Sequence, residues 1–188
     1  MDALLFALVG CLIGTLGDKS QRFVLALAER FDRDGPLILA ILLACAANAA
    51  ISATAGAFIG PLMAANARLL FLALALLFMA VGMLWPISDP DPLDGWRIGA
   101  FLTMLLGFFI LQFGDGQQFL ILGLATRTAD PVLAGIGGAI GTSAGLIPVV
   151  IGRRALLEAV PLRMIRRALG GLILLIGLAC AASALGRL

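Results

Sequence analysis

The chain has 188 residues, of which 62% are hydrophobic and only 13% are charged, and its net charge is +2. Its mean hydropathy of +1.10 excludes an ordinary soluble globular domain. The sequence contains no histidine, which excludes imidazole metal ligation and histidine-based acid/base catalysis.

Six long apolar runs follow one another along the chain, and each has about the length that a helix needs to cross a bilayer. The runs are rich in Leu, Ala and Gly, and they lack the ten-residue alternation of an outer-membrane barrel. The first run begins with Asp2 and not with a basic segment, so we interpret it as part of the protein and not as a secretion signal. We therefore predict an all-α membrane protein with six transmembrane helices, at about residues 3–28, 37–60, 69–85, 98–125, 132–152 and 169–185.

The first and fourth runs each contain a short polar string centred on Gly-Asp. The strings are Thr15–Gln21 (TLGDKSQ) and Gln112–Gln118 (QFGDGQQ), and their aspartates lie 97 positions apart. An ionisable side chain at membrane depth costs about 2.5–3.5 kcal/mol on insertion scales. Two such residues at matching places indicate a central polar site built from a duplicated unit.

The pattern of the runs divides the chain into two halves of three helices each. We predict the halves at residues 1–87 and 98–188, with a Pro- and Asp-rich cytoplasmic linker at residues 88–97. Because three is an odd number, the second half enters the membrane from the opposite side. This arrangement is an inverted-topology repeat, which is the architecture of many secondary transporters.

The second run of each half combines small residues with polar ones. Asn48 and Ser52 lie in the first half, and Thr142 and Ser143 lie in the second. These side chains either line a pathway or form interhelical hydrogen bonds with no role in transport. Glycines spaced by four residues also share one helix face there, where they permit close contact with a neighbouring helix of this chain or of a partner: Gly137, Gly141 and Gly145.

Each polar string presents oxygen-bearing side chains at a spacing of three residues, which puts them along one stripe of a helix. The stripes are Thr15, Asp18 and Gln21 in the first half and Gln112, Asp115 and Gln118 in the second. If the stripes meet at the symmetry axis, they form an all-oxygen cage that suits Ca²⁺, Mg²⁺ or Mn²⁺. We expect Gly17 and Gly114 to loosen or break the helices and to free backbone carbonyls for the same site.

Two basic side chains belong to the first string or follow it directly. Lys19 is interpreted either as a counter-ion for Asp18 or as a proton-coupling group. Arg22 is interpreted in the same way, and either side chain is long enough to reach Asp115. A purely structural ion pair is the alternative. It explains the first string better than the second, because Asp115 has no basic neighbour in the sequence.

Arginines are distributed unequally between the two sets of predicted loops. Only Arg68, Arg127 and Arg187 fall in the set that includes the C-terminus. The positive-inside rule places the other set in the cytoplasm, so we predict a multi-pass inner (plasma) membrane protein with both termini outside the cytoplasm. We interpret the basic stretch at residues 153–167 as a topology signal, with a lipid or nucleic-acid patch as the alternative. The arginine-rich set comprises Arg30, Arg33, Arg97, Arg153, Arg154, Arg163, Arg166 and Arg167.

The polar strings resemble the motif of a family of cation/proton exchangers that includes the Golgi manganese/calcium transporters and the bacterial manganese exporters. That family is marked by two copies of E-x-G-D-K-[ST], and residues 17–20 match the core of the first copy. The span count, the linker and the two halves fit over nearly the whole chain. The resemblance implies export of Mn²⁺ or Ca²⁺ from the cytoplasm in exchange for protons, with Asp18 and Asp115 as the liganding carboxylates.

The strings also depart from the family motif. The family's Glu is replaced by Thr15 in the first copy and by Gln112 in the second, while Gly116 and Gln117 replace the second Lys and hydroxyl residue. With Lys19 counted, the two strings carry a net charge of −1, where a typical pair of motifs carries −2. Because cation affinity depends on the number of charged ligands, we expect weaker binding of divalent ions, a different preferred ion, or loss of transport.

We therefore expect an exporter of divalent cations, Mn²⁺ first and Ca²⁺ second, that exchanges them for protons. The alternatives are a transporter of another small solute or monovalent cation, and a non-transporting membrane assembly protein with a degenerate cation site. We expect no enzymatic activity and no cofactor, because the sequence has no nucleophile–base pair and no cofactor fingerprint. The expected partners are the lipid bilayer, the cation and protons. We expect no nucleic-acid partner, and the sequence does not decide whether the chain forms a homodimer.

Overall fold

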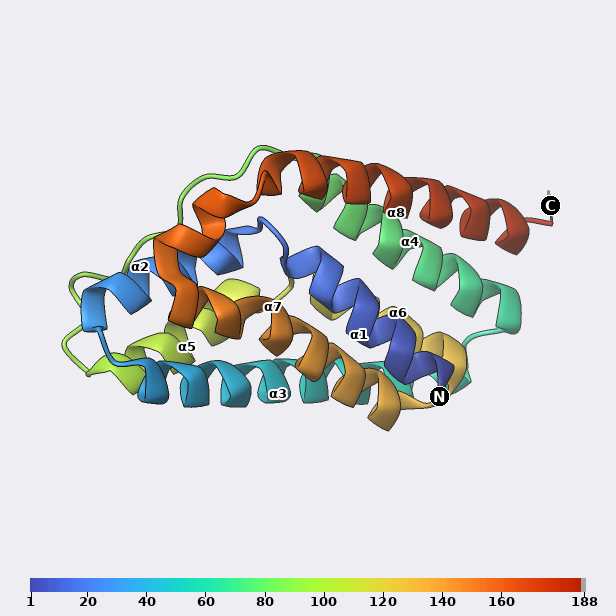
Figure 1. Ribbon diagram of the computed structural model, residues 1–188. Helices are drawn as coiled ribbons and strands as arrows, with labels where there is room; N and C mark the ends of the chain where they lie inside the picture. The colour runs from blue at the N-terminus through green and yellow to red at the C-terminus, as the bar shows by residue number, and fades with distance from the viewer. Residues whose placement is uncertain (187–188) are drawn as a thin grey trace.

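The computed structural model describes residues 1–186, which form helices and loops with no strand among them (Figure 1). Arg187, counted above on the arginine-poor side, lies outside the described residues. The helices are α1 (Asp2–Thr15), α2 (Lys19–Phe31), α3 (Asp34–Ile59), the short 3₁₀-helix η1 (Gly60–Leu62), α4 (Ala65–Leu84), α5 (Ala100–Gln112), α6 (Gly116–Thr128), α7 (Pro131–Ala159) and α8 (Leu162–Ala184).

Two of the predicted spans are bent pairs of helices and not continuous helices. The axes of α1 and α2 differ by 65°, and those of α5 and α6 differ by 66°. In contrast, α3, α4, α7 and α8 are each long and apolar enough to cross a membrane, which gives four to six candidate spans within residues 1–186. The prediction of an all-helical membrane protein is confirmed at this level.

The basic stretch at residues 153–167 is largely helical. The prediction that it forms a loop between the fifth and sixth spans is therefore wrong. Helix α7 continues through a kink at Arg153, whose φ is 48°, and only two residues separate the end of α7 from the beginning of α8. The Arg153 guanidinium pairs with Asp32 and Asp34 at the corner between α2 and α3. These ion pairs hold the kinked end of α7 against that corner.

The glycine face of α7 packs against α1 of the same chain. A Cβ atom added at Gly137 would lie 2.2 Å from the carbonyl oxygen of Leu4, and one added at Gly141 would lie 2.2 Å from that of Leu8. The two backbones are therefore in direct contact, as the spacing of small residues predicts. This face is covered within the chain, which removes it as a docking surface for a partner helix.

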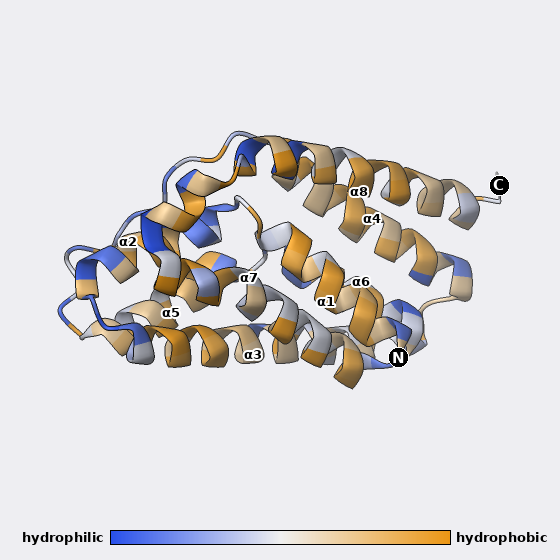
Figure 2. Cartoon of the chain, viewed as in Figure 1, coloured by the Kyte–Doolittle hydropathy of each residue, from blue (hydrophilic) through white to orange (hydrophobic). Residues whose placement is uncertain are grey.

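Helices α4 and α8 lie side by side as a pair along one edge of the molecule (Figure 1). Helix α4 also packs against α6, whereas α8 has few contacts beyond α4. Apolar residues predominate along the helices, and hydrophilic residues gather where the loops and helix ends lie (Figure 2). The beginning of α1 and the end of α8 lie at one end of the molecule, while the α2–α3 corner lies at the other (Figure 1).

The contact between α1 and α7 gives a prediction for Gly141→Ala. The new Cβ has no room beside Leu8, so the variant should lose about 1–3 kcal/mol of unfolding free energy, the usual cost of overpacking. Thermal unfolding of the detergent-solubilised protein measures this loss. Gly171→Ala is the matched control, because a Cβ at Gly171 meets no atom within 4 Å. Equal stability of the two variants would contradict the packing argument.

Candidate functional site

The two helix breaks have the same construction. Gly17 and Gly114 adopt positive φ angles of 67° and 77°, a conformation that glycine adopts without steric cost. The next residue, Asp18 or Asp115, is the N-cap of the following helix. In each break the aspartate N–H donates to the carbonyl oxygen three residues earlier, at 3.2 and 3.0 Å. The prediction that the glycines break the helices is confirmed. Each predicted stripe is therefore divided between two helices.

Two glutamines fold back onto the breaks. The Gln21 side-chain oxygen accepts the Gly17 N–H at 2.8 Å, and the Gln118 side-chain oxygen accepts the Gly114 N–H at 3.1 Å. The Gln21 amide also donates to the carbonyl oxygen of Gly145 in α7 at 2.8 Å. Both side chains thus satisfy backbone groups that the breaks leave without helical partners.

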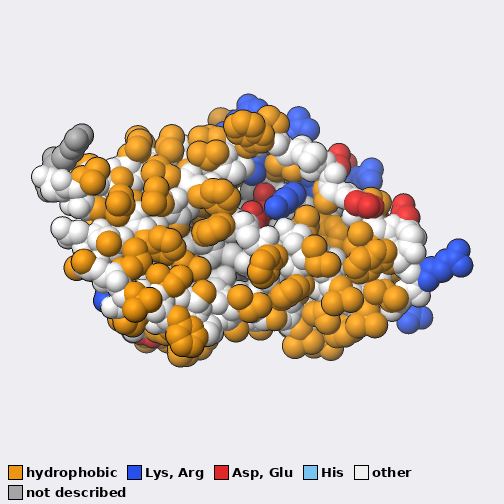
Figure 3. Space-filling model, turned by 180° about the vertical axis from the view of Figure 1, so that it is seen from behind, with side chains coloured by type: hydrophobic (Ala, Val, Ile, Leu, Met, Phe, Trp, Pro, Cys, Tyr) orange, Lys and Arg blue, Asp and Glu red, His pale blue; other side chains and the backbone are white. Residues whose placement is uncertain are grey.

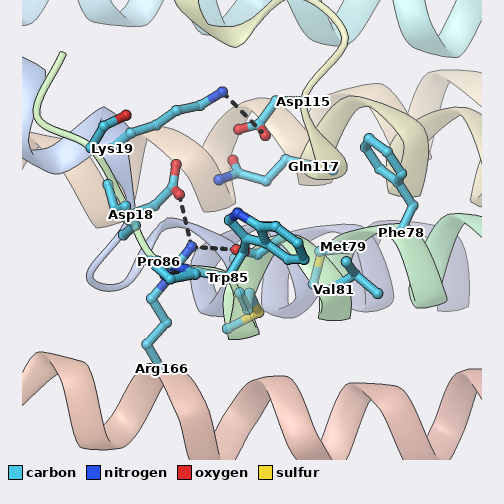
Figure 4. Close-up of a pocket in the computed structure, with 16 residues that line it drawn as sticks. Asp18, Lys19, Phe78, Met79, Val81, Trp85, Pro86, Asp115, Gln117 and Arg166 are labelled. Atoms are coloured by element: carbon cyan, nitrogen blue, oxygen red, sulfur yellow. Dashed lines mark hydrogen bonds and ion pairs between the residues drawn. The ribbon is translucent and has the colours of Figure 1, made fainter.

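Asp18 and Asp115 line one cavity of about 310 Å³ (Figure 4). Lys19, Gln117 and Arg166 line it with them, and residues 78–88 of α4 and the start of the linker form much of its wall. From outside, a recessed group of acidic and basic side chains interrupts the apolar face (Figure 3). Within residues 1–186 there is no group of three or more His, Cys, Asp or Glu side chains that could hold a metal ion. A cation here would need amide, backbone or water oxygens in addition to carboxylates.

Each aspartate of the cavity has one basic partner. The Lys19 Nζ lies 3.7 Å from Asp115 Oδ1, so this lysine reaches the second string and does not pair with its own neighbour. The Arg166 Nη2 lies 3.4 Å from Asp18 Oδ1, and the other Asp18 oxygen accepts the N–H and the hydroxyl of Ser20 at 3.3 and 3.1 Å. Arg166 belongs to α8 and is buried. Sequence reasoning missed it, because it stands in a stretch of otherwise exposed arginines.

A buried polar layer lies beside the cavity and centres on Gln117. Its side-chain oxygen accepts from the Thr142 hydroxyl at 3.0 Å and from the Gln112 amide at 3.5 Å, and the Thr15 hydroxyl lies 3.3 Å away. Asn48 in turn donates to the Gln112 oxygen at 3.2 Å. The two positions where the family motif has glutamate thus belong to one hydrogen-bonded group. Sequence reasoning did not place Gln117 in this role.

The remaining residues singled out by the sequence lie away from the cavity. Ser52 and Ser143 are buried in α3 and α7, and neither lines it. Arg22 pairs with Asp89 of the linker at 2.5 Å. It lines a neighbouring hollow of about 400 Å³, which also contains Arg163 and Arg167. The cavity and this hollow share Arg166, so they adjoin.

Comparison with known proteins gives matches over nearly the whole chain. The sequence matches the family described as "Divalent cation/proton antiporter GDT1" over residues 3–91 and 100–187, and each segment contains one polar string. It is also 32% identical, over 189 residues, to a protein of Vibrio cholerae serotype O1 named "Putative manganese exporter". That alignment covers 96% of this chain and 91% of the relative. No solved structure matches the chain.

The positive φ at the second break predicts a graded effect of substitutions at Gly114. A Cβ there meets no atom within 4 Å, so only backbone strain opposes it. Gly114→Ala should cost about 1–2 kcal/mol of unfolding free energy, Gly114→Asn less and Gly114→Val more. Thermal unfolding in detergent measures the series. Gly35→Ala is the control, since Gly35 is equally uncrowded and lies in the first turn of α3. An unchanged Gly114→Val variant would show that the break imposes no strain.

Proposed function

Because the chain belongs to the GDT1 family of divalent cation/proton antiporters, we propose that it exports Mn²⁺ from the cytoplasm in exchange for protons. Ca²⁺ is the second candidate substrate. Family membership confirms the resemblance that the polar strings indicate, and it identifies the chain as a member of a cation-transporter family. The observation that supports the specific proposal is the meeting of Asp18 and Asp115 in one cavity between two broken helices.

We assign Asp18 and Asp115 as the cation ligands. Two carboxylates neutralise a divalent cation, and hard cations prefer such oxygen ligands. The Gln117 amide oxygen lies in the same cavity and is our third candidate ligand. Thr15 and Gln112 hold the Gln117 side chain in place through the polar layer. The Gln21 and Gln118 side chains hold the backbone of the two breaks, which positions the aspartates.

Proton exchange follows from the same two carboxylates. A carboxyl oxygen that holds a proton cannot also bind a cation, so protons and Mn²⁺ compete for Asp18 and Asp115. Both aspartates lie at helix N-termini, those of α2 and α6, whose partial positive charge is part of the site's electrostatics. Lys19, 3.7 Å from Asp115, adds a positive charge that favours release of the cation from that carboxylate.

The arrangement of helices supports two inverted halves, residues 1–87 and 98–188, around the cytoplasmic linker at residues 88–97. Helices α1 to α4 contain 14, 13, 26 and 20 residues, and α5 to α8 contain 13, 13, 29 and 23 in the same order. If each bent pair crosses the membrane once, each half crosses three times. The two aspartates then occupy equivalent positions, as in other transporters whose broken helices face a central site.

Access to the cavity differs between its two sides. On one side α6 packs closely on α4, because a Cβ at Gly116 would lie only 2.9 Å from the Cα of Met79. On the other side a hollow of about 470 Å³ is lined by Asp18, by Arg22 of α2 and by the residues around Pro161, although Gly17 itself lies close to Leu162. We infer that the cavity opens toward the arginine-rich end. By the positive-inside rule this end is cytoplasmic, with both termini on the opposite side of the inner membrane.

The proposal predicts loss of transport in Asp18→Asn and in Asp115→Asn. Each variant removes one of the two proposed charged ligands. Loss of a residue that only positions a metal ligand lowers affinity or activity by roughly 10- to 100-fold, so loss of a ligand itself should reduce Mn²⁺ flux by at least that factor. Mn²⁺ tolerance of cells that lack manganese efflux and flux into proteoliposomes measure it. Asp94→Asn, in the exposed linker, is the charge-matched control and should retain native flux. The proposal fails if the native chain gives no rescue and no flux, or if both site variants transport normally.

Exchange for protons predicts that a pH gradient alone drives Mn²⁺ across the membrane. In proteoliposomes loaded with acidic buffer and diluted into alkaline medium with Mn²⁺, the outward movement of protons should accumulate Mn²⁺ inside, and a protonophore should abolish the accumulation. A pH-sensitive dye follows the protons in the same vesicles. If Mn²⁺ flux neither responds to the pH gradient nor moves protons, proton exchange is wrong, while transport of the cation stands.

A further inference from the structure

Arg166 is a buried basic side chain at the edge of the cavity, and no motif of the sequence distinguishes it. Its residue is 7% exposed, and its guanidinium faces Asp18 (Figure 4). Besides the contact with Asp18 Oδ1 at 3.4 Å, it donates to the carbonyl oxygen of Gly82 at 2.6 Å and to that of Trp85 at 3.2 Å. One side chain from α8 thus joins the end of α4 to the N-cap of α2.

The charges around the cavity balance one another. Asp18 and Asp115 face Lys19 and Arg166, so these four groups carry a net charge of zero. Adding a divalent cation to this set leaves two positive charges in excess beside Arg166 and Asp18, whose side chains are only 9% and 11% exposed, and this is unfavourable. Cation binding therefore requires the basic groups to withdraw from the carboxylates.

The two basic groups differ in how they can withdraw. The Lys19 side chain is 37% exposed and has a flexible aliphatic stem, so its ammonium group can turn away from Asp115 toward solvent. A guanidinium keeps its charge in proteins, so Arg166 can leave Asp18 only by moving. Because it also holds the carbonyl oxygens of Gly82 in α4 and of Trp85 directly after α4, its movement changes how the beginning of α8 is attached to the end of α4.

We propose that Arg166 is a built-in competitor of the transported cation. Its guanidinium neutralises Asp18 while the site is empty, and cation binding at Asp18 displaces it and releases the first turns of α8 from α4. This inference rests on the proposed function, since it assigns a role at the same cation site. A purely structural brace makes the opposite prediction, because its loss would weaken cation binding or leave it unchanged.

The test is a titration of the purified full-length protein with MnCl₂ at fixed pH, in which electron paramagnetic resonance reports the free Mn²⁺. Arg166→Gln removes the competing charge, so its Kd for Mn²⁺ should fall by about tenfold, within the usual range of coupling between two ligands. Arg166→Lys keeps the charge and should restore a Kd close to that of the native chain. Arg167→Gln makes the same change one residue away on an exposed side chain, and its Kd should not change.

The outcomes separate the two proposals. If the native chain binds Mn²⁺ and a folded Arg166→Gln variant binds it no more tightly, the competitor role is wrong and the cation site stands. If neither the native chain nor the variant binds Mn²⁺ or Ca²⁺, both proposals fail. If only Arg166→Gln binds, the competitor role is supported and the native transport function is not.

A measurement on the native chain does not depend on the folding of any variant. Hydrogen exchange of the backbone amides at residues 162–169 should become faster when saturating MnCl₂ releases α8 from α4. MgCl₂ at the same concentration controls for ionic strength and for general divalent effects. Unchanged or slower exchange at these residues, with Mn²⁺ shown to be bound, would overturn the proposed displacement.

Discussion

Backbone groups that lose their helical partners are costly in a bilayer, because the hydrocarbon core offers no water to replace those partners. The two helix breaks at Gly17 and Gly114 create such groups, and the rest of the site is built around satisfying them. A glutamine four residues after each glycine accepts its N–H, and each aspartate occupies the N-cap position of the helix that follows, where the Asp18 side chain also accepts the Ser20 N–H. The same geometry that satisfies the breaks therefore brings two carboxylates to one cavity.

This geometry also explains why the cavity contains balanced charge and not a cluster of acids. Two carboxylates at helix N-termini are stabilised by the partial positive charge of those termini, and each has a basic partner in addition. Replacement of the family's glutamates by Thr15 and Gln112 removes two further charges, and these residues join the neutral layer around Gln117. In the proposed mechanism, a divalent cation binds here only when the basic groups withdraw from the carboxylates, and this links ion binding to movement of α8.

Part of this architecture could be predicted from the sequence. The apolar runs, the glycines that break two of them and the small-residue face of α7 each follow from local chemistry. The sequence could not show that Lys19 reaches Asp115 or that Arg166 reaches Asp18, since both contacts depend on how distant helices pack. Arg166 also looks the same as its neighbours Arg163 and Arg167, and only burial distinguishes it from them.

The proposed role of Asp18 and Asp115 as the cation ligands is tested most directly by anomalous scattering from crystals soaked in Mn²⁺. The account predicts one strong peak in the cavity, within about 2.0–2.6 Å of an oxygen of each carboxylate, the range of hard-cation ligands. It also predicts that the Arg166 guanidinium no longer contacts Asp18 in that crystal. A cavity without a peak while Mn²⁺ binds elsewhere, or a peak that contacts neither aspartate, would contradict it.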